Sequence, residues 1–141
     1  MLDCLILGDS IAVGTAQQRP ECVAYAHGGW NSWQWNKNFI TKDLSANTVI
    51  ISLGSNDHQN VNTFKELLKL RESIQAERVY WIKPAGNLPA SSVPIENIQA
   101  MIDIIAKNYG DVELSIPQIS KDGIHPTGQG YRELAERTRV K

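Results

Sequence analysis

Apolar residues along the chain fall into short runs separated by polar stretches rich in glycine, proline and serine. Five of these runs are four to six residues long and consist mostly of aliphatic or β-branched residues. Near-continuous apolar runs are typical of strands that are covered on both faces. They predict strands at residues 2–7, 22–26, 48–53, 78–82 and 111–114.

The segments between these runs carry apolar residues three or four positions apart, the spacing of an amphipathic helix. Residues 95–109 show it most clearly, with Ile98, Met101, Ile102 and Ile105 on one face and Gly110 as the stop. The other predicted helices are residues 11–18, residues 33–40, a helix from Asn62 or Thr63 to about 76, and a last helix from Pro126 to about 139.

Strands alternate with helices along the whole chain, a pattern that predicts a parallel sheet with helices on both faces. A length of 141 residues predicts one domain over residues 1–141. In a parallel sheet the carboxyl ends of the strands meet at one edge, where α/β proteins bind their ligands. Polar residues that follow the strands are therefore the first candidates for a functional site.

Charge and apolar patterning argue against nucleic acid as a partner and against a membrane span. The net charge of −1 gives no electrostatic case for nucleic acid. The longest apolar runs are far too short to span a membrane. The first seven residues read as a strand, so no signal peptide is expected. A cytoplasmic location is the default, with an extracellular or virion-associated one left open, and the oligomeric state is also left open.

The two cysteines, Cys4 and Cys22, fall in predicted strands that are expected to be neighbours. Buried free thiols are the expected state, because a free cysteine behaves as a small apolar residue. The alternative is a disulfide, which requires suitable geometry and an oxidising compartment. Neither cysteine lies in a pattern that could supply four metal ligands, so no structural zinc site is expected.

Ser10 stands where the first strand breaks into a helix, in Gly8-Asp9-Ser10. A serine at this position can simply cap the helix. It can also present its hydroxyl to a crevice, where N–H groups of the first helical turn could hold an oxyanion. Gly8 permits the tight turn, and the side chain of Asp9 can bond to nearby backbone groups.

His125 follows Asp122 by three residues, with Gly123 allowing the chain to bend. This spacing lets the carboxylate accept a hydrogen bond from one ring nitrogen, so that the other nitrogen can serve as a general base toward Ser10. The alternative is a capped helix start, with Asp122 or Thr127 as the polar cap.

Two further loops could supply hydrogen-bond donors to an oxyanion. Asn56 follows the strongest predicted strand and could donate from its side chain, or merely satisfy a turn. Asp57 beside it is expected to hold the shape of the loop. Gly28 and Gly29 follow the second strand; paired glycines often mark only a turn, but here a backbone N–H could face the site.

Four sequence blocks together resemble those of the SGNH (GDSL-like) hydrolases: Gly8-Asp9-Ser10, Gly28-Gly29, Gly54-Ser55-Asn56-Asp57 and Asp122-Gly123-Ile124-His125. The resemblance implies a flavodoxin-like, three-layer α/β/α fold and ester hydrolysis without a metal or another cofactor. It implies that Ser10 is the nucleophile, His125 the base and Asp122 its orienting partner. The oxyanion hole would consist of the N–H of Ser10, the side chain of Asn56 and a glycine N–H, with Gly29 favoured over Gly28.

The sequence gives less information about the substrate. Trp30, Trp33 and Trp35 could pack the core or form an aromatic platform for a sugar ring or an acyl chain. His58 and residues 83–92 are expected to border the site. With few apolar insertions, a short-acyl ester is favoured, such as an O-acetyl group on a glycan. The alternatives are a lipase or thioesterase, a carbohydrate- or phosphate-binding module without turnover, and a flavodoxin-like cofactor protein.

Overall fold

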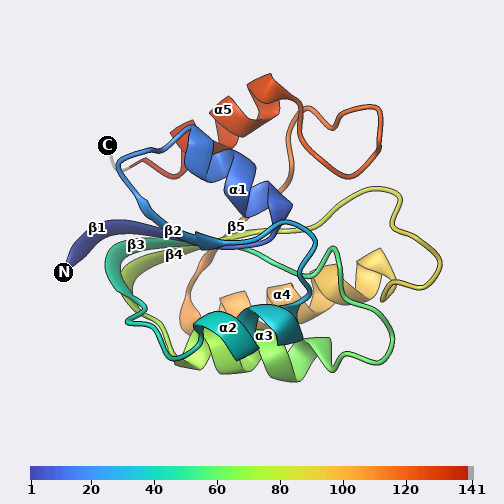
Figure 1. Ribbon diagram of the computed structural model, residues 1–141, viewed down its shortest axis with the longest axis horizontal. Helices are drawn as coiled ribbons and strands as arrows, with labels where there is room; N and C mark the ends of the chain where they lie inside the picture. The colour runs from blue at the N-terminus through green and yellow to red at the C-terminus, as the bar shows by residue number, and fades with distance from the viewer. Residues whose placement is uncertain (140–141) are drawn as a thin grey trace.

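One five-stranded parallel sheet forms the centre of the protein in the computed structural model, which describes residues 1–139. The strand order across the sheet is β2-β1-β3-β4-β5 (Figure 1). The strands are β1 (Leu2–Gly8), β2 (Val23–Ala26), β3 (Ser45–Ser52), β4 (Gln75–Ile82) and β5 (Val112–Leu114). The chain leaves β1 toward β2 and then returns to β3. The order therefore reverses beside β1, and such a switch point opens a crevice at the carboxyl ends of the strands.

Helices cover both faces of the sheet (Figure 1). On one face lie α1 (Ser10–Gln17) and α5 (Gly128–Arg137). On the other lie α2 (Ser32–Phe39), α3 (Thr63–Glu72) and α4 (Ile95–Tyr109). Successive residues of a strand point to opposite faces, so each buried strand supplies both apolar layers. In β3, Ile50 packs with the α1 and α5 side, while Val49 and Ile51 pack with the other side. The three-layer α/β/α prediction is confirmed.

The boundaries of several elements differ from the predicted ones. Strand β3 begins at Ser45 and β4 at Gln75, earlier than expected, and α3 correspondingly ends at Glu72. Pairing across the sheet explains the difference, because Ala46 lies opposite both Leu2 and Ala76. Short polar or alanine-containing segments have weak strand propensity, so only their neighbours hold them in the sheet.

The last helix also starts later than predicted, at Gly128 rather than Pro126. Thr127 is the N-cap, with its hydroxyl accepting a hydrogen bond of 3.2 Å from the N–H of Gly130. This arrangement leaves Pro126 in a short antiparallel bridge with Ile119, where its fixed φ suits extended backbone. Residues 120–125 are thus closed into a loop that presents His125.

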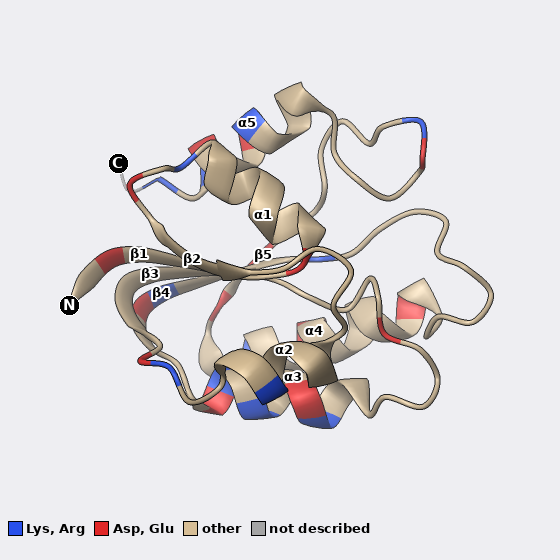
Figure 2. Ribbon diagram, viewed as in Figure 1, with Lys and Arg blue, Asp and Glu red and all other residues tan. Residues whose placement is uncertain are grey.

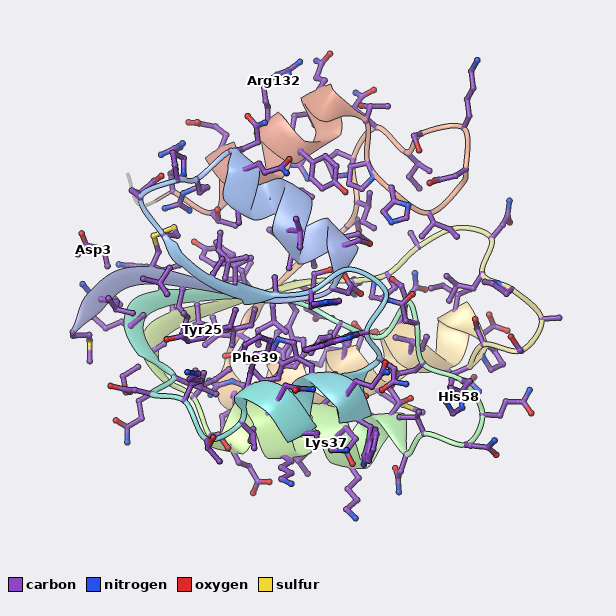
Figure 3. All side chains as sticks on the ribbon, viewed as in Figure 1. Asp3, Tyr25, Lys37, Phe39, His58 and Arg132 are labelled. Carbon is purple, nitrogen blue, oxygen red and sulfur yellow. A yellow bond between two sulfur atoms is a disulfide. The ribbon has the colours of Figure 1, made fainter. Side chains whose placement is uncertain are left out.

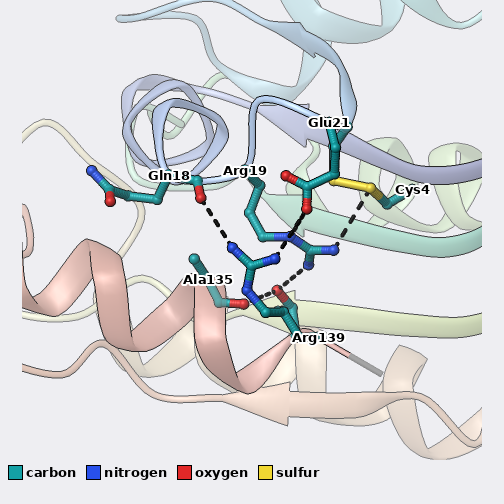
Figure 4. The surroundings of a disulfide bond; sticks show 8 residues. Cys4, Gln18, Arg19, Glu21, Ala135 and Arg139 are labelled. Carbon is teal, nitrogen blue, oxygen red and sulfur yellow. Dashed lines mark hydrogen bonds and ion pairs between the residues drawn. A yellow bond between two sulfur atoms is a disulfide. The ribbon is translucent and has the colours of Figure 1, made fainter. Parts of the chain in front are cut away.

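Cys4 and Cys22 form a disulfide, so the expectation of free thiols was wrong (Figure 4). The register between β1 and β2 explains the bond. Leu5 lies opposite Val23, and one step back along both strands brings Cys4 opposite Cys22, with their Cα atoms 4.8 Å apart. Apolar character alone could not separate a buried thiol from a half-cystine, whereas strand register does.

Within residues 1–139, none of the helices has the length and apolar character needed to cross a membrane.

Candidate active site

The turn between β1 and α1 places Ser10 at the first position of the helix. Asp9 caps the helix, its Oδ1 accepting a 3.0 Å hydrogen bond from the N–H of Ile11. The N–H of Asp9 in turn donates to the carbonyl of Ser52 at 3.0 Å. Gly8 adopts a φ of +144°, and a Cβ there would lie 1.9 Å from the oxygen of Ser52. Only glycine allows β1 to approach the end of β3 this closely, so Gly8 fixes where Ser10 emerges.

Ser10 and His125 are 115 residues apart in sequence but in direct hydrogen-bond contact. The Oγ of Ser10 lies 2.8 Å from Nε2 of His125, and Nδ1 of His125 lies 2.7 Å from Oδ2 of Asp122. An ionised carboxylate can only accept, so Nδ1 carries the hydrogen and donates to Asp122. Nε2 of a neutral imidazole is then left to accept from the hydroxyl of Ser10, the arrangement of a serine nucleophile with its base.

The side chain of Asp122 is exposed, yet it is strongly held in the ionised form. The backbone N–H groups of His125 and Ile124 donate to its Oδ1 at 2.9 and 2.8 Å, and Ser120 Oγ donates at 2.9 Å. These bonds, with that of the His125 ring, hold the pKa of the Asp122 carboxyl well below its usual range. Gly123, with a φ of +73°, allows the bend that brings both N–H groups to one oxygen.

The loop that carries His125 is braced from two sides. The N–H of Ser120 donates to the carbonyl of His125 at 2.8 Å, and the N–H of Asn87 donates to the carbonyl of Gly123 at 3.0 Å. A Cβ at Gly86 would lie 1.4 Å from that same carbonyl oxygen, so the loop after β4 can pack here only because residue 86 is glycine. These contacts fix the position of the imidazole relative to Ser10.

Asn56 lies in the loop after β3 and points toward the loop after β2. Its Nδ2 donates to the carbonyl of Trp30 at 3.1 Å. A side-chain amide has two N–H hydrogens, so one can fix the orientation while the other remains free to donate. Gly28 lies against Ser10, because a Cβ at residue 28 would be 3.7 Å from Cβ of Ser10. Gly29 adopts a φ of +81° and has no such neighbour within 4 Å.

Asp57 joins the loops that surround this site. It is fully buried and accepts three hydrogen bonds, from Ser32 N at 2.8 Å, Ser32 Oγ at 2.6 Å and Thr63 Oγ1 at 2.7 Å. Its own carbonyl accepts from the N–H of Val93 at 2.9 Å. The starts of α2 and α3 and the loop before α4 are therefore tied to the residue next to Asn56. The sequence suggested that Asp57 holds its loop, but Ser32 and Thr63 resembled ordinary helix starts and gave no signal of this contact.

Asp9, like Asp57, is a buried carboxyl, and it lies next to Ser10 in the chain. Complete burial raises the pKa of Asp9 to about 7, against the opposing effects of its bond from Ile11 N and of nearby His125. Among the described residues, Oδ2 of Asp9 has no hydrogen-bond partner. Asp122, and not Asp9, is the carboxyl that forms a hydrogen bond with His125.

A pocket of about 300 Å³ opens beside Ser10 and His125. Its lining combines polar side chains, among them Asn56, His58, Ser91 and Ser92, with apolar ones such as Pro89 and Ile124. This lining includes His58 and part of residues 83–92, which were predicted to border the site. Ser55 and Ile124 also line the pocket; both belong to the sequence blocks that resemble those of the SGNH hydrolases, but neither was predicted to contact the substrate.

The three clustered tryptophans have different environments. Trp35 is fully buried and packs the core, with its indole N–H donating to the carbonyl of Tyr25 at 2.9 Å. Trp30 is half-buried and stacks on the ring of His27, with centroids 4.0 Å apart, and it does not contribute to the pocket lining. Trp33 is 50% exposed on the outer side of α2. A direct substrate contact by Trp30 stays a prediction.

One cluster of side chains has the ligand spacing that a metal site needs. Within residues 1–139, Cys4, Glu21 and Cys22 are the one group of three that brings ligand atoms close enough together for a metal ion. Both sulfurs of that group are in the disulfide, so neither can act as a thiolate ligand.

Comparison with known proteins identifies the fold. No protein-family model and no curated sequence matches the chain. Solved structures do match. A GDSL-like lipase from Bacteroides thetaiotaomicron aligns with a TM-score of 0.71 and 21% identity, over 96% of this chain and 84% of that one. The catalytic domain of peptidoglycan O-acetyltransferase A from Streptococcus pneumoniae aligns with a TM-score of 0.66 and 13% identity, over 99% and 97%.

These similarities show that the chain has the fold of the GDSL-like lipases and acylhydrolases. The SGNH resemblance of the four sequence blocks is thereby confirmed at the level of the fold.

Proposed function

We propose that this protein is a serine esterase, acting as a single domain, in which Ser10 is the nucleophile, His125 the general base and Asp122 its orienting carboxylate. The observation that carries the proposal is the hydrogen-bonded line from Asp122 Oδ2 through His125 to Ser10 Oγ, with links of 2.7 and 2.8 Å. Its position at the switch point of a GDSL-like fold adds support, because ligands bind at this edge in open α/β sheets.

The reaction begins when Ser10 Oγ attacks the ester carbonyl and Nε2 of His125 takes the hydroxyl proton. Negative charge develops on the carbonyl oxygen, where the N–H of Ser10, the free N–H of Asn56 and the N–H of Gly29 would donate. The tetrahedral intermediate collapses, and His125 returns the proton to the departing alcohol. Water activated by the same imidazole then hydrolyses the acyl-enzyme and releases the acid and free Ser10.

The surroundings of Ser10 favour a short acyl group on a polar alcohol. The pocket measures about 300 Å³, and Asn56, Ser91, Ser92 and the ring of His58 contribute polar groups to its lining. A long acyl chain would need a larger apolar surface to offset its transfer from water. A sugar hydroxyl, in contrast, can exchange hydrogen bonds with these groups. The substrate class we propose is therefore an O-acetylated glycan or a similar small ester.

The direct test is hydrolysis of p-nitrophenyl acetate, butyrate and octanoate by pure protein in the presence of a chelator. We expect turnover of the acetate, weaker turnover as the acyl chain lengthens, and no effect of the chelator, because each step uses protein groups alone. A folded sample that hydrolyses none of these esters would favour a carbohydrate-binding module without turnover. Preference for octanoate would favour a lipase.

A further inference from the structure

A groove on the outer side of α2 and α3 lies outside the proposed catalytic site. It measures about 340 Å³ and is bordered by Trp33 and Lys37 of α2 and by Lys65, Glu66 and Lys69 of α3. Figure 2 shows the basic positions of these two helices on the side of the molecule away from α1 and α5. The groove and the pocket beside Ser10 have no lining residue in common.

Trp33 supplies an exposed aromatic surface to this groove. Half of its surface is exposed, so part of the indole is open to a ligand. The ammonium group of Lys37 lies 5.1 Å from the centre of its ring. The side chain of Lys37 extends away from the sheet in Figure 3. An indole face packs well against the apolar C–H face of a sugar ring, and the adjacent ammonium presents a positive charge to the same ligand.

The charge of the groove is positive in a protein whose net charge is −1. In the described part of the chain, Lys37, Lys65 and Lys69 have no ion-pair partner within 4.0 Å, and all three are exposed. The one carboxylate of the groove, Glu66, is buried and accepts a 2.9 Å hydrogen bond from Asn36 Nδ2. Three ammonium groups without an ion-pair partner, of which that of Lys37 contacts the Trp33 ring, outnumber the one engaged carboxylate and make the groove complementary to an anion.

The floor of the groove also retains an unused acceptor. Asn36 is 3% exposed, and its Nδ2 donates to both the backbone carbonyl and the side chain of Glu66. Its Oδ1 has no hydrogen-bond partner among the residues that the structure describes. Buried polar atoms are seldom left unpaired in folded proteins. This buried amide adds a polar group beneath the groove, beside the engaged carboxylate of Glu66.

The groove starts near the edge of the sheet that holds Ser10. Trp33 and Lys65 lie in the first turns of α2 and α3, which follow the carboxyl ends of β2 and β3. Lys37 and Lys69 lie one turn further along the two helices. Because the sheet is parallel, a linear polymer seated in the groove would extend from the neighbourhood of the active-site edge along the outer helices.

We propose that this groove binds a uronate-containing polysaccharide, with Trp33 packing on a sugar ring and Lys37, Lys65 and Lys69 pairing with its carboxylates. Where the chain is esterified, the groove would hold the polymer while an O-acyl group reaches Ser10; that coupling rests on the proposed esterase function, but the binding itself does not.

The test is affinity electrophoresis of the full chain in native gels that contain polygalacturonate, with neutral dextran for comparison. This polymer carries no ester, so the result is independent of turnover. We expect retardation by polygalacturonate only, weakening as salt is added because exposed charges are screened. Trp33→Ala should weaken binding about five- to tenfold, and Lys65→Ala combined with Lys69→Ala at least as much.

Two exposed side chains of α4 provide matched controls, Ile104 for loss of apolar surface and Lys107 for loss of charge. Ile104→Ala and Lys107→Ala should bind polygalacturonate as the wild type does. Thermal unfolding of each variant, Trp33→Ala above all, checks that it is folded. The proposal would be overturned if polygalacturonate did not retard the wild type, or if dextran retarded it equally. It would also be overturned if the α4 control variants lost as much affinity as the groove variants.

Discussion

The side-chain amide of Asn56 donates to the backbone carbonyl of Trp30 at 3.1 Å, across the gap between the loops that follow β3 and β2. This bond fixes the plane of the amide and leaves its second N–H available. The same loop carries Asp57, whose carboxylate holds the start of α2 through Ser32. The proposed oxyanion donor is thus oriented before substrate arrives, the condition under which electrostatic stabilisation is most effective.

Replacement of Asn56 by alanine should reduce kcat by about 10²–10³, the usual effect of removing one oxyanion donor. The loss should appear mainly in kcat, because the bond strengthens as charge develops on the carbonyl oxygen. Asn56→Asp should be worse, since a carboxylate would repel that charge. Steady-state kinetics on p-nitrophenyl acetate provide the measurement. An increase in KM with unchanged kcat would instead make Asn56 a substrate-binding or turn residue.

Asp57→Ala should lower both stability and kcat, because it leaves Ser32 and Thr63 without the acceptor that joins α2 and α3. Loss of hydrogen bonds to a buried carboxylate costs about 3 kcal/mol of unfolding free energy. Asp57→Asn can still accept from Ser32 N and should recover part of both quantities. Asp43→Ala, which removes an exposed acceptor from Ser45 N, is the control for a generic loss of a loop carboxylate. Unchanged kcat in a folded Asp57→Ala variant would show that it does not position Asn56.

Much of the fold could be predicted from the sequence because it depends on local patterns, and the candidate site residues were chosen from such patterns too. Apolar runs predicted all five strands, and residues 95–109 were predicted with the boundaries of α4. Ser10 and Asn56 were singled out because each follows a predicted strand, and His125 because Asp122 precedes it by three residues. The contact of Asp57 with Thr63 and the pairing of Cys4 with Cys22 depend instead on loop packing and strand register. Neither leaves a pattern in the sequence nearby.

Stability should fall as the pH rises from about 4 to about 7 because of Asp9. Its pKa is raised from 3.8 to about 7 by burial, so the folded state binds a proton that the unfolded state has lost in this interval. The contribution of the protonated Asp9 carboxyl to the free energy of unfolding is fully present below about pH 4 and is lost as the pH rises through 7. It amounts to about 4 kcal/mol at most, from the difference between the two pKa values.

Asp9→Asn keeps an acceptor for the N–H of Ile11 but cannot ionise. Chemical denaturation from pH 4 to 8 should therefore show a smaller fall in unfolding free energy for this variant than for the wild type. Above pH 7 the variant should be the more stable of the two. Parallel curves for the two proteins would contradict a pKa near 7 for Asp9.

The disulfide should contribute about 3 kcal/mol to stability, the usual effect of closing a loop of this size, whose ends are 18 residues apart. A reducing agent should lower the Tm of the wild type, and a variant with Cys4→Ser and Cys22→Ser should begin at the lower value. The Tm of that variant should not respond to the reductant, which serves as the internal control. A wild-type Tm that is independent of a reductant shown to free both thiols would contradict this contribution.

The central claim is that acyl transfer passes through Ser10. The most direct measurement is peptide mass mapping of protein that is mixed with p-nitrophenyl acetate and quenched in acid during turnover. We expect an acetyl group on the peptide that contains Ser10. In Ser10→Ala this adduct should be absent, and activity should fall by about 10⁴-fold or more. An acetyl group on another residue, or a Ser10→Ala variant that retains a substantial part of wild-type activity, would contradict the claim.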